Sequence, residues 1–96
     1  MAVVLIHQMR LSEEQYDRLG QSLNPQGLNS PSDWPVPGLI SHVAGTMPDG
    51  TFCVVDVWES EEAVEQFGQK LMPVFGEIGV ADPPPPTVFP AYKHVT

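Results

Sequence analysis

The segment that decides the fold runs Leu39-Ile-Ser-His-Val-Ala-Gly-Thr46, then Met47-Pro-Asp-Gly50, then Thr51-Phe-Cys-Val-Val-Asp-Val-Trp-Glu59. Its outer parts are short apolar runs rich in β-branched residues, which is typical of strands. The Pro-Asp-Gly between them is typical of a tight turn, so the segment predicts a β-hairpin. Ser60-Glu61-Glu62 follows, with a capping serine and acidic residues where a helix dipole favours them, and predicts that a helix begins there.

This helix has an apolar stripe, most of which is expected to be core with one edge on a cavity. The stripe consists of Val64, Phe67, Leu71, Phe75 and Ile78. Pro73 lacks a backbone N–H and its ring clashes with the preceding turn. We therefore expect the helix to break or kink near Leu71, to restart through Ile78 and to end at Gly79.

The flanking sequence completes a β-α-β-β-α-β order. Residues 2–8 are predicted as a strand, and Ser12 with Gln15 forms a capping box that starts a helix through Leu23. In that box Tyr16 is assigned as the partner of Leu11 in a hydrophobic staple. Residues 24–38 hold four prolines and are predicted as a loop, with covering a pocket mouth as one role. A last strand is expected over residues 87–95, with Pro90 restricting it to an edge.

That order predicts an α+β, ferredoxin-like single domain over residues 1–96, with a four-stranded antiparallel sheet. Its first and third strands carry apolar residues at both odd and even positions, so both faces of these strands are apolar. In the first strand, for example, Val3 and Leu5 lie on one face and Val4 and Ile6 on the other. Two helices cover only one face of such a sheet, and a second face in water would carry polar residues. We therefore expect a second copy of the chain to cover it, giving a homodimer of the dimeric α+β barrel type.

Composition excludes several partners. Twelve acidic residues against four basic ones give a formal charge of −8, which disfavours nucleic acid and anionic membranes. The opening apolar run is too short for a signal peptide or a membrane span. Cys53 is the single cysteine, so no internal disulfide can form and a reducing compartment fits. We expect a cytoplasmic protein.

The segment from His42 to Pro73 resembles members of the antibiotic biosynthesis monooxygenase-like superfamily. The most specific part is Val57-Trp-Glu-Ser-Glu-Glu-Ala63, a strand end that runs into a helix start. That superfamily includes cofactor-independent oxygenases of aromatic polyketides, heme-degrading enzymes and small proteins of unassigned role. The resemblance strongly implies the fold and dimerisation. It only weakly implies the reaction, which would be that of an oxidoreductase.

Departures from that pattern bear on cofactors. Oxygenase members carry an asparagine where this chain has Val54. Heme-degrading members have an asparagine at the position of His7 and an iron-binding histidine on the second helix, but no histidine lies between Ser60 and Pro90. The resemblance therefore implies no heme, and we expect no cofactor. The three histidines, His7, His42 and His94, are widely separated, so no metal site is expected either.

Two residues are candidates for catalysis. His7 lies in an otherwise aliphatic strand and could act as a general acid or base, or be a hydrogen-bonded structural histidine. Asp56 is the one charge inside its strand and could abstract a proton or belong to a structural pair. If its face is closed, its carboxylate needs a partner, and the candidates for that role are His7, Arg10, Tyr92 and Lys93.

The candidate ligand contacts are Trp58, Phe67, Phe75 and His42. Trp58 could stack on a planar ligand or anchor a helix. The face that His42 occupies depends on the hairpin register. A four-residue loop pairs His42 with Val55, away from Asp56 and Trp58, whereas a five-residue loop reverses the face. We predict the four-residue loop, with His42 toward the partner subunit.

Together these features predict a small-molecule enzyme or binding protein with an apolar pocket lined by His7, Trp58, Phe67 and Phe75. The expected chemistry is proton transfer or cofactor-free oxygenation of a hydrophobic, aromatic or polyketide-like substrate, with His7 or Asp56 as base. A non-catalytic ligand-binding or structural homodimer is the alternative.

Overall fold

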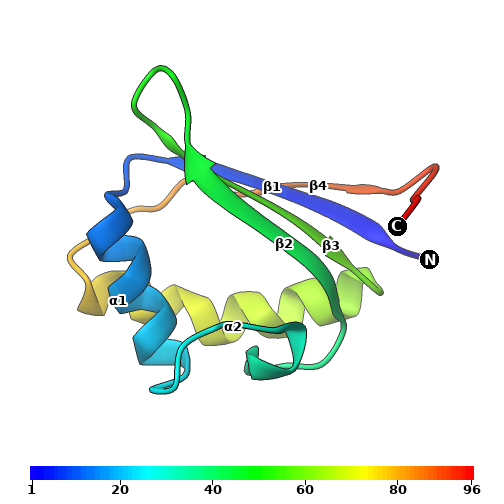
Figure 1. Cartoon of the computed structure of the whole chain (residues 1–96), viewed down its shortest axis with the longest axis horizontal. Coiled ribbons are helices and arrows are strands. Elements are labelled where there is room, and N and C mark those ends of the chain that lie inside the picture. The colour runs from blue at the N-terminus through cyan, green and yellow to red at the C-terminus, as the bar shows by residue number, and fades with distance from the viewer.

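The predicted hairpin lies on one side of a four-stranded antiparallel sheet. In the computed structural model, which describes all 96 residues, the strands are β1 (Val3–Met9), β2 (Leu39–Thr46), β3 (Phe52–Trp58) and β4 (Thr87–Pro90). They are ordered β2-β3-β1-β4, with every neighbouring pair antiparallel. The helices α1 (Glu13–Leu23) and α2 (Glu61–Glu77) both pack on one face of the sheet (Figure 1). The α+β, ferredoxin-like prediction is confirmed.

Both helices begin as their sequences indicate. The Ser12 hydroxyl accepts the Gln15 N–H, and the Gln15 side chain accepts the Ser12 N–H, which is a complete capping box. At α2 the Ser60 hydroxyl accepts the Ala63 N–H. Each cap satisfies backbone donors that have no partner within the helix.

The predicted break of this helix at Pro73 is wrong, because α2 runs as one helix from Glu61 to Glu77 with Pro73 inside it. Proline in a helix interior costs about 3 kcal/mol. Phe67 lies on one side of it and Val74 and Phe75 on the other, and all three are buried. Their burial contributes about 1.5–3 kcal/mol each, which outweighs the single unfavourable position.

The predicted hairpin register is also wrong. Thr46 pairs with Phe52 rather than Thr51, and His42 therefore pairs with Asp56. The carboxylate of Asp49 accepts both the backbone N–H and the hydroxyl of Thr51, at 2.9 and 2.6 Å. These bonds hold Thr51 in the turn, so the loop has five residues. The shift by one places His42 on the helix side of the sheet, with Asp56.

The last strand is shorter than predicted. β4 ends at Pro90 rather than continuing to Val95, and all four of its residues are exposed. Proline has no N–H for a ladder, so the pairing with β1 stops there. The Ala91 N–H still donates to the Ala2 carbonyl at 2.9 Å, which keeps the two chain ends adjacent (Figure 1).

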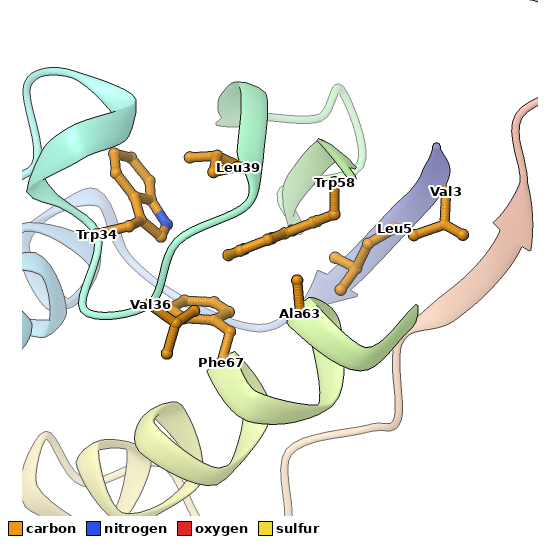
Figure 2. Close-up of a cluster of buried hydrophobic side chains, with 8 residues drawn as sticks. All are labelled: Val3, Leu5, Trp34, Val36, Leu39, Trp58, Ala63 and Phe67. Carbon is orange, nitrogen blue, oxygen red and sulfur yellow. The ribbon is translucent and has the colours of Figure 1, made fainter. Parts of the chain in front are cut away.

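Only one of the two faces of the sheet is covered by other parts of the chain. On the helix side Val3, Leu5 and Trp58 belong to a buried cluster with Ala63 and Phe67 of α2 (Figure 2). The opposite face, here called the outer sheet face, is covered by no element of the chain (Figure 1). Its apolar side chains are half-buried or exposed. They are Val4, Ile6, Val43, Cys53, Val55, Val57 and Phe89.

Candidate functional site

An apolar cavity lies between the helix side of the sheet and the two helices. Its empty volume is about 820 Å³ when the open solvent at its mouth is counted, and fifteen of its twenty lining residues are hydrophobic. The sheet, both helices and the loop after α1 all contribute walls. Pockets that bind small molecules are mostly apolar with a few placed polar groups. This cavity has that composition.

The loop of residues 24–38 supplies part of the cavity wall, as the sequence suggested. Leu28 and Trp34 of this loop line the cavity. The Trp34 ring centroid lies 4.9 Å from that of His42. A short 3₁₀ helix, η1 (Pro31–Asp33), precedes Trp34, and the Asp33 carboxylate accepts the N–H groups of Asn29 and Ser30. The loop is thus held in shape by its own hydrogen bonds.

Four side chains form a continuous hydrogen-bond chain at the cavity. The Tyr16 hydroxyl bonds Nε2 of His42, and Nδ1 of His42 lies 2.5 Å from Oδ1 of Asp56. The other carboxylate oxygen, Oδ2, accepts the indole N–H of Trp58 at 3.2 Å. Tyr16, His42 and Asp56 line the cavity, whereas Trp58 does not.

One arrangement of hydrogens satisfies every bond of this chain, with the Asp56 carboxylate as acceptor. An ionised carboxylate only accepts hydrogen bonds, so Nδ1 of His42 carries the hydrogen that Asp56 accepts. In the neutral ring Nε2 then holds a lone pair, which accepts the Tyr16 O–H. Asp56 is 2% exposed and the His42 side chain 17%, so the pair is largely removed from water. This arrangement prepares His42 to take a proton that arrives through Tyr16.

The sequence-based partners of Asp56 are therefore wrong. Its carboxylate bonds neither His7 nor Arg10, Tyr92 or Lys93, but His42 and Trp58. The register shift explains the difference, because it brings His42 directly opposite Asp56 on the same face.

Trp58 lies outside the cavity lining and holds Asp56 in position. It is fully buried, its ring centroid lies 5.1 Å from that of Phe67, and its N–H orients Asp56. Figure 2 shows its ring between the sheet and α2. Of the four residues predicted to line the pocket, His7, Phe67 and Phe75 line this cavity and Trp58 does not.

His7 lines a different part of the same cavity. Its Nε2 lies 2.6 Å from the carbonyl oxygen of Pro84, and its ring meets Phe75 edge to face, with centroids 6.0 Å apart. Pro84 belongs to the segment 83–86 that connects α2 to β4. His7 and the Tyr16–His42–Asp56 chain share no hydrogen bond.

Two residues of the site were missed from the sequence. Tyr16 occupies the helix position of a hydrophobic staple, and its apolar ring gave no sign that its hydroxyl would meet His42. Trp34 lies in a proline-rich loop without periodicity. A buried tyrosine or tryptophan usually gives its polar atom a partner, which is the signal that could have found Tyr16.

Burial raises the pKa of the Tyr16 phenol above its usual value of 10.0, and the charges of Asp56 and Asp17 raise it further. Tyr16 therefore stays protonated where an ordinary tyrosine begins to ionise. The pKa of Tyr16 is higher in the folded state than in the unfolded state. Its contribution to the free energy of unfolding is therefore fully present below pH 10 and is lost as the pH rises through the folded-state pKa.

We expect an absorbance titration to show a tyrosine step above pH 10 that is absent in Tyr16→Phe. The step should persist in Tyr92→Phe, because Tyr92 is fully exposed. Its persistence in Tyr16→Phe would show that another group causes it.

The fold and this cavity define a ferredoxin-like domain with an Asp-His-Tyr chain in an apolar pocket. Rv0793 from Mycobacterium tuberculosis has the same fold, with a TM-score of 0.67, 13% identity and full coverage of both chains. A candidate antibiotic biosynthesis monooxygenase from Chloroflexus aurantiacus J-10-fl gives a TM-score of 0.63 at 19% identity over 100% of this chain and 98% of that one.

A conserved protein from Methanosarcina mazei Go1 gives 0.59 at 14% identity, over 94% of this chain and 92% of that one. No protein-family model and no curated protein matches the sequence. The chain thus has the fold of antibiotic biosynthesis monooxygenase-like proteins, which confirms the resemblance at the level of fold.

Two further observations concern membranes and metals. Neither helix has the length and apolar composition that crossing a membrane requires. No three or more His, Cys, Asp or Glu side chains are grouped as metal ligands would be.

Proposed function

We propose that this protein is a cytoplasmic, small-molecule enzyme of the antibiotic biosynthesis monooxygenase type. It would bind an aromatic or polyketide-like molecule in the apolar cavity and remove a proton from it. The observation that carries this proposal is the Tyr16–His42–Asp56 chain, which ends in an otherwise apolar pocket. A general base held by a carboxylate and screened from water is suited to proton transfer.

In the proposed step the substrate gives its proton to the Tyr16 oxygen while the Tyr16 proton moves to Nε2 of His42. The raised pKa of Tyr16 disfavours a free phenolate, so both transfers occur together. The imidazolium that forms is stabilised by Asp56, 2.5 Å away, whose own position is fixed by Trp58. The base that we propose is thus His42, held by Asp56, rather than His7.

Oxygenation without a cofactor follows from the same step. Removing a proton from a hydroxyaromatic or anthrone-like molecule gives an electron-rich carbanion, which can add molecular oxygen directly. With anthrone, one O₂ would be consumed, anthraquinone formed and water released. The fold shared with the candidate monooxygenase from Chloroflexus aurantiacus supports this reaction class over other proton transfers.

Oxygen uptake with anthrone tests the proposal. We expect Tyr16→Phe and His42→Phe to lower the rate about a hundredfold or more, which is the usual contribution of a general base. Tyr92→Phe is the control, because that tyrosine is fully exposed. Uptake that is equal in all four proteins would refute the assigned base. Binding of anthrone without any uptake would support the alternative of a non-catalytic binding protein.

We also propose that the protein is a homodimer formed through the outer sheet face. That face carries none of the twelve acidic residues on its strands, while the whole chain has a charge of −8. Association of two copies by any acidic surface is repulsive, whereas the outer sheet face is apolar and self-complementary about a two-fold axis.

A further inference from the structure

We infer that the cavity takes an elongated, flat molecule whose body lies against Gly68 and whose far end donates a hydrogen bond to Nδ1 of His7. This inference rests on the proposed function for the claim that the cavity binds a ligand, and adds which ligand class fits it. Two independent observations carry it: a side chain missing from the cavity wall, and an unpaired acceptor on a buried ring.

Gly68 lies in the middle of the α2 face that lines the cavity. The other residues on that face are Val64, Phe67, Leu71, Met72 and Phe75. Glycine inside a helix is about 1 kcal/mol less favourable than alanine, so its presence needs a reason. Neither a positive φ nor close packing supplies one, because Gly68 has ordinary helical geometry and a Cβ there would meet no atom within 4 Å. The effect of glycine at this position is to leave space in the cavity that a side chain would fill.

His7 presents the unpaired acceptor. The Pro84 carbonyl can only accept, so the Nε2 that bonds it carries the hydrogen, and Nδ1 of the neutral ring holds a lone pair. No protein group bonds Nδ1, although His7 is only 7% exposed. Every fully enclosed side-chain nitrogen and oxygen of the protein has a partner, so Nδ1 must reach open space. The open space that His7 lines is the cavity.

The contacts of His7 hold this acceptor in place. Pro84 lies in a run of four prolines, a stiff segment without N–H donors, and Phe75 packs its ring edge to face with His7. The ring is therefore fixed from two sides, and its tautomer is fixed by the carbonyl. A ligand O–H or N–H that reaches Nδ1 meets an acceptor that is already oriented.

The sheet register sets the length of the ligand. His7 is opposite Val54, which is opposite Ala44, and His42 lies two residues further along β2. Two strand spacings and two residue rises give roughly 12 Å between the Cα atoms of His7 and His42. A molecule that reaches both needs a polar group at each end and an apolar body between them. Hydroxylated fused aromatic rings have this form.

Binding of two probes to four variants tests the inference. The probes are naphthol, with one hydroxyl, and a dihydroxynaphthalene with hydroxyls at opposite ends. Binding is read from the change in tryptophan fluorescence, since one of the two tryptophans, Trp34, lines the cavity. We expect the wild type to bind the diol about tenfold more tightly, the value of one good hydrogen bond.

The variants separate the two contacts. In His7→Gln the amide nitrogen can still reach Pro84 but no acceptor occupies the place of Nδ1, so the preference for the diol should vanish. In His7→Asn the amide oxygen takes that place and the preference should remain. Gly68→Leu should weaken both probes at least tenfold, whereas Gly76→Leu, on the exposed side of α2, should change neither.

Equal preference in wild type and His7→Gln, or equal affinity in wild type and Gly68→Leu, would overturn the inference. Those results leave the proposed function standing, because it depends on Tyr16 and His42. If the wild type binds neither probe and also takes up no oxygen with anthrone, the proposed function fails and this inference fails with it.

Discussion

Replacing Asp56 with alanine should lower the free energy of unfolding by about 3 kcal/mol, because it leaves two donors without an acceptor. They are Nδ1–H of His42 and the indole N–H of Trp58, which is fully buried. Each unsatisfied buried donor costs about 1–3 kcal/mol. The substitution also removes the desolvation cost of the buried carboxylate, which offsets part of that sum. Urea denaturation, with its midpoint and slope, measures the change.

A double variant identifies the cause of that loss. His42→Phe combined with Asp56→Leu removes the His42 donor together with its acceptor. The Trp58 N–H stays unpaired, and the Tyr16 hydroxyl also loses its partner, but it lines the open cavity. Buried ion pairs can often be replaced by apolar residues without loss of stability. We therefore expect the double variant to recover more than half of the loss of stability while its oxygen uptake stays about a hundredfold or more below that of the wild type. If the double variant recovers no stability, loss of the His42–Asp56 hydrogen bond is not the cause of the destabilisation in Asp56→Ala.

That expected recovery bears on why the pair exists. An apolar pair would serve the fold about as well, since the rest of the surrounding wall is already hydrophobic. The polar pair places a histidine that can take up protons inside that wall instead. The pKa of Tyr16, which bonds this histidine, is raised by burial, and a titratable group perturbed in this way in a cleft is typical of functional sites. The stability measurement and the uptake measurement therefore separate folding from function at the same two positions.

Periodicity predicted the elements of the fold but not their details. The apolar, β-branched runs in residues 2–8 and 51–59 and the serine caps of both helices depend on neighbours within a few residues, which the sequence displays directly. The hairpin register depends on whether one residue, Thr51, belongs to the turn or to the strand. The side chain of Asp49 decides this by bonding Thr51, and the turn sequence alone allowed both loop lengths.

Pro73 shows a different limit. The local rule for proline was applied correctly, but the outcome depends on whether the residues beyond it have a core to enter. Val74 and Phe75 pack with Met9 and Phe52 of the sheet, contacts between residues distant in sequence. Tertiary burial of this kind overrides local preference, and only the three-dimensional structure reveals it.

The candidate site was predicted as single residues and not as a connected group. His7, His42 and Asp56 were recognised because ionisable residues are unusual inside apolar strands. Their partners come from other elements, Tyr16 from α1 and Pro84 from the segment before β4, and no spacing in the sequence encodes those contacts. The same register error that misplaced His42 also hid its bond to Asp56.

That register error is also the reason why His42 was expected to face the partner subunit. With His42 on the helix side of the sheet, its replacement should affect the cavity instead. The interface test moves to Val55, which lies on β3 between Ile6 of β1 and Val43 of β2 on the outer sheet face. Val55 is 38% exposed in the single chain and Val43 66%.

Val55→Glu should convert the proposed dimer into monomers, because two-fold symmetry buries two new carboxylates in one apolar interface. Each uncompensated charge costs several kcal/mol, and 1.4 kcal/mol is a factor of ten, so the association constant should fall at least about a hundredfold. Sedimentation velocity at micromolar concentration measures it. Gln69→Glu, an exposed residue of α2, adds the same charge outside the interface and should leave the dimer intact. Added salt should strengthen the wild-type dimer, since both copies carry a charge of −8. A monomeric wild type, or a Val55→Glu variant that still sediments as a dimer, would show that the outer sheet face is not the interface.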